Sequence, residues 1–262
     1  MTTDQEAARQ AASAQPPASS DSSQQAVVPF APTDKQDAES ARELIAEALL
    51  QDQSVTYFAK RKLRHQLGVW REMVRLNYAA ALSYSEPPLF FTTACRNSAA
   101  LCFLYPAQQV SMWQYIRHGG LAPLVQHFRA SRWLPALKHQ AALDREKARC
   151  VERRGPLLFV FVLATRAEHR NRGLGSRLLR RIAAEADARG LWCYLEASSP
   201  DNRRLYLRHG YQDVKELRPE PRKEGSPVYY IMERPPGCGA AAAAAAAAAE
   251  TEVWHHSSGR AA

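Results

Sequence analysis

The sequence predicts an α/β fold, because strand patterns and helix patterns alternate along it. Residues Leu157–Leu163 form a continuous apolar run rich in β-formers, which is typical of a buried strand. A turn with two glycines follows, and apolar residues then recur every four positions over Leu174–Ala186, which indicates one apolar face of a helix. Leu191–Glu196 has the composition of a second strand, and residues 202–209 have that of a short helix that ends at a glycine.

The first half of the chain and its end contain further helix and strand patterns. An edge strand is expected at Ala26–Phe30, where Pro29 is tolerated. The elements expected after it are a helix capped by Thr33 or Asp34 that includes Leu44 and Leu49, a helix over about 55–82, strands at Leu89–Thr93 and Ala100–Tyr105, a helical insertion over 111–149 that is broken at Gly119-Gly120 and at Pro135, and a last strand at Val228–Met232.

The composition predicts one ordered domain between two tails. Residues 1–25 consist mainly of Gln, Ser, Ala, Thr and Pro with almost no large apolar side chains, so they are expected to be disordered. Residues 236–262 include ten successive alanines without an amphipathic face, and we expect a low-complexity tail there. The domain is therefore expected over 26–235, which is long enough to bury a core.

The segment Arg170-Asn171-Arg172-Gly173-Leu174-Gly175 connects the first strand to its helix. Such a turn exposes several backbone N–H groups, and the helix dipole adds partial positive charge, so that a phosphate group is favoured. Glycine lets phosphate oxygens approach closely. The segment is not a dinucleotide fingerprint, because position 178 is Leu, and it is not a P-loop, because no Lys follows Gly175. On these residues alone, a helix N-terminus that happens to carry glycines stays an alternative.

The residues after the second strand complete an ordered pattern, namely Asn202, Leu205-Tyr206 and Gly210-Tyr211. Together with Arg170, Gly173 and Gly175, this order resembles the GNAT superfamily of acyl-CoA N-acyltransferases. The stretch from Leu195-Glu196 to Asn202 is most similar to puromycin N-acetyltransferase-like members. The resemblance implies the GNAT fold, a mixed twisted sheet of about six to seven strands with helices on both faces. One departure is Thr165-Arg166-Ala167 where the family usually has V-x-P, which leaves the geometry of that bend open.

The resemblance implies an N-acetyltransferase that moves an acetyl group from acetyl-CoA to a primary amine, without a metal. Direct attack within a ternary complex and a small-molecule acceptor are expected. Backbone N–H groups from Asn171 to Ser176 are expected to hold the pyrophosphate, and the free strand edge at Leu163 and Thr165 to pair with the pantetheine arm. The residues expected to bind acetyl-CoA are Leu163, Thr165, Arg170, Asn171, Arg172, Gly173, Leu174, Gly175, Ser176 and Asn202.

Two residues carry the implied chemistry. The resemblance makes Tyr206 the acid that protonates the coenzyme A sulfur, and the alternative is a packed aromatic side chain. It makes Glu196 the base or an acid that orients the amine, and the alternative is an exposed carboxylate at a strand end. His169 and His209 are expected to be surface residues.

Charge and cysteine content limit the remaining classes. The net charge of +9 includes a basic stretch at 60–75, which is most simply a set of solvated helix faces, since no nucleic-acid-binding motif is present. The positive field also attracts anionic coenzyme A. Five cysteines without a C-x-x-C pair indicate neither a disulfide framework nor a zinc site, and favour a reducing compartment.

No secretory core and no run of membrane-spanning length are present, so no membrane partner and a cytoplasmic location are expected. Organellar targeting and the oligomeric state stay open. Two other functions also stay open: a protein acetyltransferase acting on lysines or N-termini, and a non-catalytic acyl-CoA-binding module. The insertion at 111–149 is either a roof over a small acceptor or a docking face for a protein.

Overall fold

The computed structural model describes residues 23–30, 35–110 and 112–237. Nearly all of the two predicted tails, and the predicted helix cap at Thr33 or Asp34, lie outside these residues. Within the described ranges, no helix is both long enough and apolar enough to cross a membrane.

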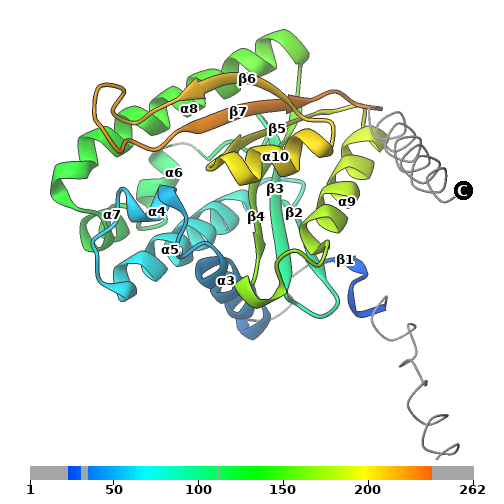
Figure 1. The fold of residues 1–262 in the computed structure, drawn as a ribbon, viewed down its shortest axis with the longest axis horizontal. Coiled ribbons are helices and arrows are strands. Elements are labelled where there is room, and N and C mark those ends of the chain that lie inside the picture. Colours follow the sequence, from blue (N-terminus) through cyan, green and yellow to red (C-terminus); the bar gives the residue numbers. More distant parts are fainter. Residues whose placement is uncertain (1–22, 31–34, 111, 238–262) are drawn as a thin grey trace, which may run out of the picture.

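Seven strands form one mixed sheet in the order β1-β2-β3-β4-β5-β7-β6 (Figure 1). All neighbouring pairs are antiparallel except β4 and β5, which are parallel. The predicted mixed sheet and its size are therefore confirmed. The strands are β1 (Val27–Pro29), β2 (Leu89–Thr93), β3 (Ser98–Tyr105), β4 (Leu157–Thr165), β5 (Trp192–Ala197), β6 (Gln212–Leu217) and β7 (Tyr229–Arg234).

Helices cover both faces of the sheet, as predicted (Figure 1). Leu44, Val74 and Leu143 of three helices pack with Phe159 and Tyr194 on one face. The opposite face packs against two other helices, α9 and α10. The helices are α3 (Lys35–Ala48), α4 (Gln53–Thr56), α5 (Leu63–Ala81), α6 (Met112–Arg117), α7 (Leu121–His127), α8 (Trp133–Arg154), α9 (Leu174–Ala188) and α10 (Pro200–Arg208), with single 3-10 turns η1 (Ala130–Arg132) and η2 (Ala167–His169).

Two helix predictions are wrong. The helix predicted over 55–82 is divided into α4 and α5, because Ala59 pairs with Phe128 and the Lys60 N–H donates to the His127 carbonyl. The predicted break at Pro135 does not occur. Pro135 is the third residue of α8, where the helix has no use for its missing N–H, and α8 continues to Arg154.

The strand β6 was not predicted from the sequence. Five of its six residues are exposed, and its sequence QDVKEL lacks the alternation of a half-buried strand. It forms through its backbone pairing with β7, at the edge of the sheet.

Candidate active site

The two parallel strands at the centre of the sheet separate after the first three residues of each. β4 and β5 are paired as far as Phe159 and Tyr194. Beyond that point β4 continues to Thr165 beside β3, and β5 continues to Ala197 beside β7. The facing edges of these end segments have no strand partner within the described residues, so their backbone groups are free to bind an extended ligand.

A β-bulge explains the separation. The register of β4 against β3 passes from Val162 directly to Val160, so Phe161 is an extra residue in β4. A bulge bends its strand and increases the local twist. Leu163 and Thr165, predicted to face the pantetheine arm, lie on the part of β4 beyond the bulge.

The turn after β4 presents a row of free N–H groups. Asn171 and Gly173 both have positive φ, 61° and 77°, and Gly173 caps the N-terminus of α9. The first N–H that bonds back into the helix is that of Arg177, to the Gly173 carbonyl. The six N–H groups from Asn171 to Ser176 have no hydrogen-bond acceptor in the described part of the chain. Alternating backbone of this kind at a helix N-terminus forms an anion-binding concavity.

Glycine is favoured at positions 173 and 175 of the turn for two different reasons. Gly173 needs its left-handed backbone, and a Cβ there would meet nothing within 4 Å. A Cβ on Gly175 would make only ordinary contacts, the nearest 3.6 Å from Leu163. The protein's own packing does not require glycine at 175, so the absence of a side chain there is explained by a ligand that approaches the backbone closely. The turn is therefore suited to the pyrophosphate of acetyl-CoA.

Some predicted cofactor-binding residues have side chains bonded within the protein. The Arg170 guanidinium donates to the carbonyl of Ala48 at 2.6 Å, at the end of α3, so it holds the turn against that helix. Thr165 Oγ1 lies 2.7 Å from the hydroxyl of Ser98. The amide of Asn202 donates to Ser198 Oγ at 3.3 Å. Arg172 is exposed beside the turn, and Leu174 is buried beneath it.

His209, predicted to be a surface residue, belongs to the wall of the turn. Its Nε2 lies 3.0 Å from the hydroxyl of Ser176. Burial, together with nearby arginines, lowers the pKa of His209 to about 4, so the imidazole is neutral near pH 7. The half-buried His169 lies in η2, just before the turn.

Tyr206 lies on the α9 side of the sheet. It is in α10, is buried, and packs against Tyr211 with ring centroids 5.7 Å apart. No hydrogen bond joins its hydroxyl to another described residue. Burial raises the pKa of Tyr206 above its ordinary value, and the nearby Asp52 carboxylate adds to the effect. The hydroxyl therefore keeps its proton at neutral pH, as a proton donor must.

Glu196 lies on the opposite side, facing α8. Its Oε1 is 3.5 Å from the ammonium of Lys147, a buried residue that also lies 3.9 Å from the centre of the Phe159 ring. Burial raises the pKa of Glu196, and the Lys147 charge opposes this rise. Only 16% of the Glu196 side chain is exposed. Glu196 is therefore not an exposed carboxylate at a strand end, which was the alternative interpretation of the sequence.

Two residues of this region were missed from the sequence, Asp52 and Lys147. Asp52 caps α4, accepting hydrogen bonds from the N–H of Ser54 at 2.8 Å and from the hydroxyl of Ser198 at 2.5 Å. Its sequence signal is that of a helix cap only. Lys147 follows His139 and Leu143 at intervals of four on the buried face of α8, and this spacing could have identified it.

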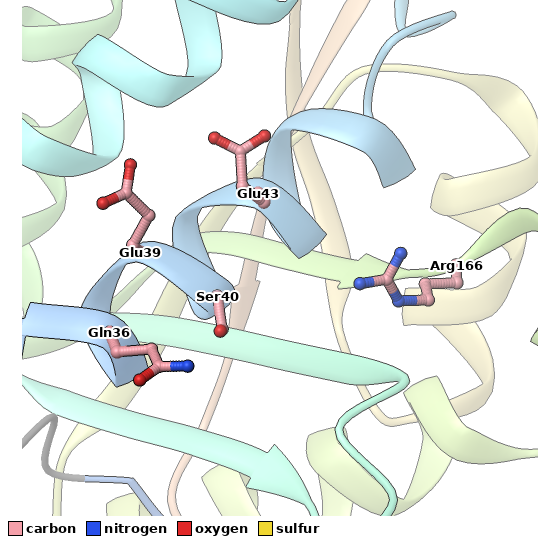
Figure 2. Close-up of a pocket in the computed structure, with 5 residues that line it drawn as sticks. All are labelled: Gln36, Glu39, Ser40, Glu43 and Arg166. Carbon is pink, nitrogen blue, oxygen red and sulfur yellow. The ribbon is translucent and has the colours of Figure 1, made fainter.

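A separate hollow of about 500 Å³ lies between α3 and the end of β4 (Figure 2). Figure 2 shows Arg166 on one side of it and, on the other, four residues of α3, namely Gln36, Glu39, Ser40 and Glu43. No predicted site residue lines it. Its two carboxylates would repel the phosphates of coenzyme A, so the hollow is not assigned to the acyl donor.

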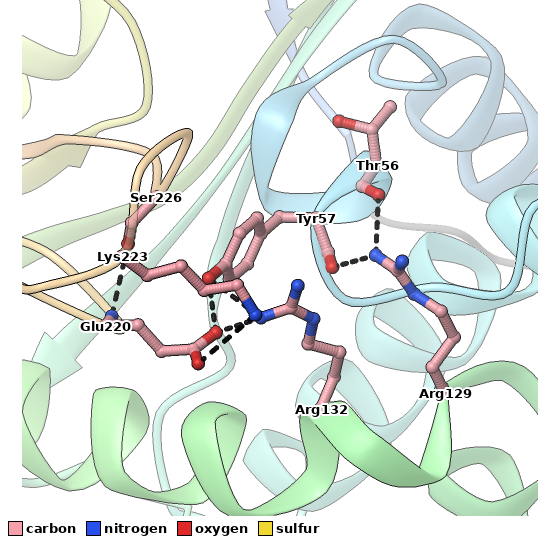
Figure 3. A network of polar contacts seen from close by, with 7 residues as sticks. All are labelled: Thr56, Tyr57, Arg129, Arg132, Glu220, Lys223 and Ser226. Atoms are coloured by element: carbon pink, nitrogen blue, oxygen red, sulfur yellow. Dashed lines mark hydrogen bonds and ion pairs between the residues drawn. The ribbon is translucent and has the colours of Figure 1, made fainter.

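A polar network joins the connection between β6 and β7 to Tyr57, next to α4, and to Arg132 of η1 (Figure 3). The Glu220 carboxylate accepts hydrogen bonds from the Tyr57 hydroxyl and the Arg132 guanidinium. Arg132 also donates to the Tyr57 hydroxyl at 2.9 Å and stacks over its ring at 4.3 Å. Lys223 adds a second positive charge 3.6 Å from Glu220. The connection at 218–228 is thereby held close to α4 and η1.

A protein-family model described as an acetyltransferase (GNAT) domain matches residues 141–213. This segment contains the end of α8, both diverging strands, the phosphate turn, Glu196 and Tyr206. Residues 141–213 therefore belong to a GNAT acetyltransferase domain. With this domain, the chain is an acetyl-CoA-dependent acetyltransferase. The closer likeness to puromycin N-acetyltransferase-like members stays a prediction, and no curated protein sequence matches the chain.

Solved GNAT structures share the fold at low sequence identity. The chain is 21% identical, with a TM-score of 0.51, to a histone acetyltransferase HPA2 and related acetyltransferase from Corynebacterium glutamicum, covering 80% of this chain and 96% of that one. It is 10% identical, with a TM-score of 0.52, to arylalkylamine N-acetyltransferase 2 from Aedes aegypti, covering 80% and 98%. It is 14% identical, with a TM-score of 0.50, to the polyamine N-acetyltransferase of Drosophila melanogaster, covering 80% and 100%.

Proposed function

We propose that this GNAT protein transfers the acetyl group of acetyl-CoA to the primary amine of a small molecule, by direct attack within a ternary complex. The observation that carries the proposal is the opening between β4 and β5, which has the free N–H groups of the turn at one end. Tyr206 lies on one face of the sheet at this opening, and Glu196 lies on the other.

The donor side is assigned to the turn and the free edge of β4. Backbone N–H groups from Asn171 to Ser176 hold the pyrophosphate, and the edge at Leu163 and Thr165 pairs with the amides of pantetheine. In this proposal Arg170 positions the turn through its bond to Ala48, and Asn202 orients Ser198. The bound thioester supplies an activated acetyl group.

The acceptor side is assigned to Glu196. A primary amine is an ammonium at neutral pH and must lose a proton before its nitrogen can form the new bond to the acetyl carbon. The Glu196 carboxylate accepts that proton, and its raised pKa suits the task. As the bond from carbon to sulfur breaks, the nitrogen releases its second proton to solvent, and Tyr206 gives its hydroxyl proton to the departing thiolate and recovers one from solvent.

The small-molecule acceptor is supported by the enclosure of Glu196. The carboxylate is nearly buried beneath α8, and the β6–β7 connection is fixed above α4 by the Tyr57, Arg132 and Glu220 network. Of the similar solved structures, one is a polyamine and one an arylalkylamine N-acetyltransferase, and both acceptors are small amines.

A protein acceptor is the second candidate function. Leu121 and Val125 of α7 and Leu134 and Leu137 of α8 are exposed apolar side chains on the insertion, as on a docking face. One similar structure is a histone acetyltransferase and related acetyltransferase.

An acceptor screen tests the proposal. The full chain is incubated with acetyl-CoA and either small amines, a lysine peptide or a peptide with a free N-terminus, and free thiol and acetylated product are measured. We expect amine-dependent thiol release with a small amine. Transfer to peptides alone would replace the proposal with the second candidate, and binding of acetyl-CoA without transfer to any acceptor would contradict both.

A further inference from the structure

A group of buried side chains beside Glu196 has hydrogen-bonding atoms without a partner. Both ring nitrogens of His139 and the hydroxyl of Tyr229 make no hydrogen bond in the described part of the chain. His139 is 6% exposed and Tyr229 is 5% exposed. Native structures rarely leave buried polar atoms unpaired, and a bound ligand is one reason for them to do so.

The three rings of this group form an aromatic wall. The centres of the His139 and Tyr229 rings lie 4.3 Å apart, and Phe58 stacks on His139 with centres 6.1 Å apart. Burial lowers the pKa of His139 to about 4, so near pH 7 the ring is neutral and offers one N–H donor and one nitrogen acceptor. The wall is therefore aromatic and uncharged near pH 7, with a few hydrogen-bonding atoms, which suits an aromatic ring that carries a hydroxyl group.

The sheet register places this wall beside the proposed base. Glu196 of β5 pairs with Ile231 of β7, so Tyr229, two residues earlier, projects from the same face as Glu196. Two residues of strand correspond to about 7 Å. On α8, His139 contacts Tyr229 and Lys147 contacts Glu196, so the helix lies over both ends of this span.

Two carboxylates act on this span. Besides burial, the Asp52 carboxylate raises the pKa of both Tyr206 and Tyr229, and Glu196, which is paired with Lys147, also raises that of Tyr229. The three rings of the wall carry no carboxylate of their own, so the ammonium group of an acceptor is expected at the carboxylates and its ring at the wall.

We propose that His139 and Tyr229 determine acceptor specificity and that the acceptor is a hydroxylated aromatic amine with a single ring. This rests on the proposed function and extends it to a substrate class. The ammonium group lies at Glu196, and the ring lies against the wall with its hydroxyl bonded to His139 and Tyr229.

The test uses tyramine and 2-phenylethylamine, which differ by one hydroxyl, together with spermidine and a lysine peptide. For the wild-type protein, kcat/KM for tyramine should exceed that for 2-phenylethylamine by about 10-fold or more, because a site with unpaired polar groups discriminates against a substrate that cannot bond them. Tyr229→Phe and His139→Phe keep the rings and remove the polar atoms, so each should bring this ratio close to one while 2-phenylethylamine is still acetylated. Tyr78→Phe, which removes a hydroxyl from α5 away from the site, should leave the ratio unchanged.

Equal kcat/KM for the two aromatic amines in the wild-type protein would overturn the proposal, as would a ratio that Tyr229→Phe and His139→Phe both preserve. Acetylation of spermidine or the peptide in preference to tyramine would overturn it while leaving acetyl transfer intact. Transfer to none of the amines would contradict the proposed function itself. The readout is the ratio of kcat/KM for tyramine to kcat/KM for 2-phenylethylamine, and both values are measured on the same protein sample. Partial misfolding of a variant lowers both values equally and does not change the ratio.

Discussion

The hydroxyl of Tyr206 combines burial with the lack of a hydrogen-bond partner in the described chain, and this suits a group that gives up its proton only in the transition state. Tyr206→Phe keeps the ring and its packing. We expect kcat to fall by about 100-fold with the KM for acetyl-CoA nearly unchanged, measured by steady-state thiol release. Tyr211→Phe, in the same buried cluster, is the matched control and should retain kcat. Wild-type kcat for Tyr206→Phe, when acyl transfer limits the rate, would make Tyr206 structural.

The role proposed for Glu196 predicts a feature of the pH dependence of kcat/KM. Burial raises its pKa, so the acidic limb of kcat/KM should lie above the ordinary range of a glutamate. Glu196→Gln cannot accept a proton and should lower kcat/KM by about 100-fold and abolish this limb. Glu216→Gln on the exposed strand β6 serves as the control. If the limb persists and only the KM for the amine rises, Glu196 orients the acceptor; unchanged kinetics would remove it from the site.

At the scale of the elements, sequence prediction succeeded where the signal was local. β2 and β4 are apolar runs, and the turn from Arg170 to Gly175 has its chemistry in consecutive backbone groups. The exposed strand β6 has no such pattern. The break between α4 and α5 depends on residues about 70 positions away, since Ala59 pairs with Phe128. The acceptor side was missed for the same reason, because Asp52, His139 and Tyr229 meet only through the tertiary fold.

The network around Glu220 predicts how the β6–β7 connection is held. Arg132→Ala removes the guanidinium from Glu220 and from the Tyr57 ring, while Lys223 stays near. Since the pair is partly exposed, we expect a loss of about 1 kcal/mol in the free energy of unfolding. Limited trypsin digestion should cleave faster at Arg218, Arg222 and Lys223 than in the wild-type protein. Arg145→Ala, an exposed arginine of α8, is the control, and equal cleavage of both variants would show that the network does not hold the connection.

For the molecule as a whole, two histidines make stability dependent on pH. Burial lowers the pKa of both His139 and His209 to about 4. The unfolded chain binds these protons near the ordinary histidine pKa, so between about pH 6.5 and 4 the unfolded state holds more protons than the folded state. The stability contribution is complete above this window and is lost as the pH falls through it.

We expect the loss at His139 to reach about 3 kcal/mol at pH 4, and a smaller loss at the less buried His209. Urea unfolding between pH 7.5 and 4.5 measures it, and carboxylate titration is removed by comparison with His139→Phe. The free energy of unfolding of the wild-type protein minus that of the variant should decrease as the pH falls. A difference independent of pH would show that His139 takes up its proton in the folded state as readily as in the unfolded chain.

The sheet has a donor side and an acceptor side that meet only where β4 and β5 separate, and the central claim is that the turn before α9 binds the pyrophosphate of acetyl-CoA there. Gly173→Asp places a carboxylate against the phosphates. Gly190→Asp makes the same change at a glycine with similar φ, +63° against +77°, at the other end of α9, and so carries the same backbone cost. The measurement is the shift in melting temperature caused by acetyl-CoA. We predict a clear upward shift for the wild-type protein and for Gly190→Asp, and none for Gly173→Asp; an equal shift in all three folded proteins would contradict the account.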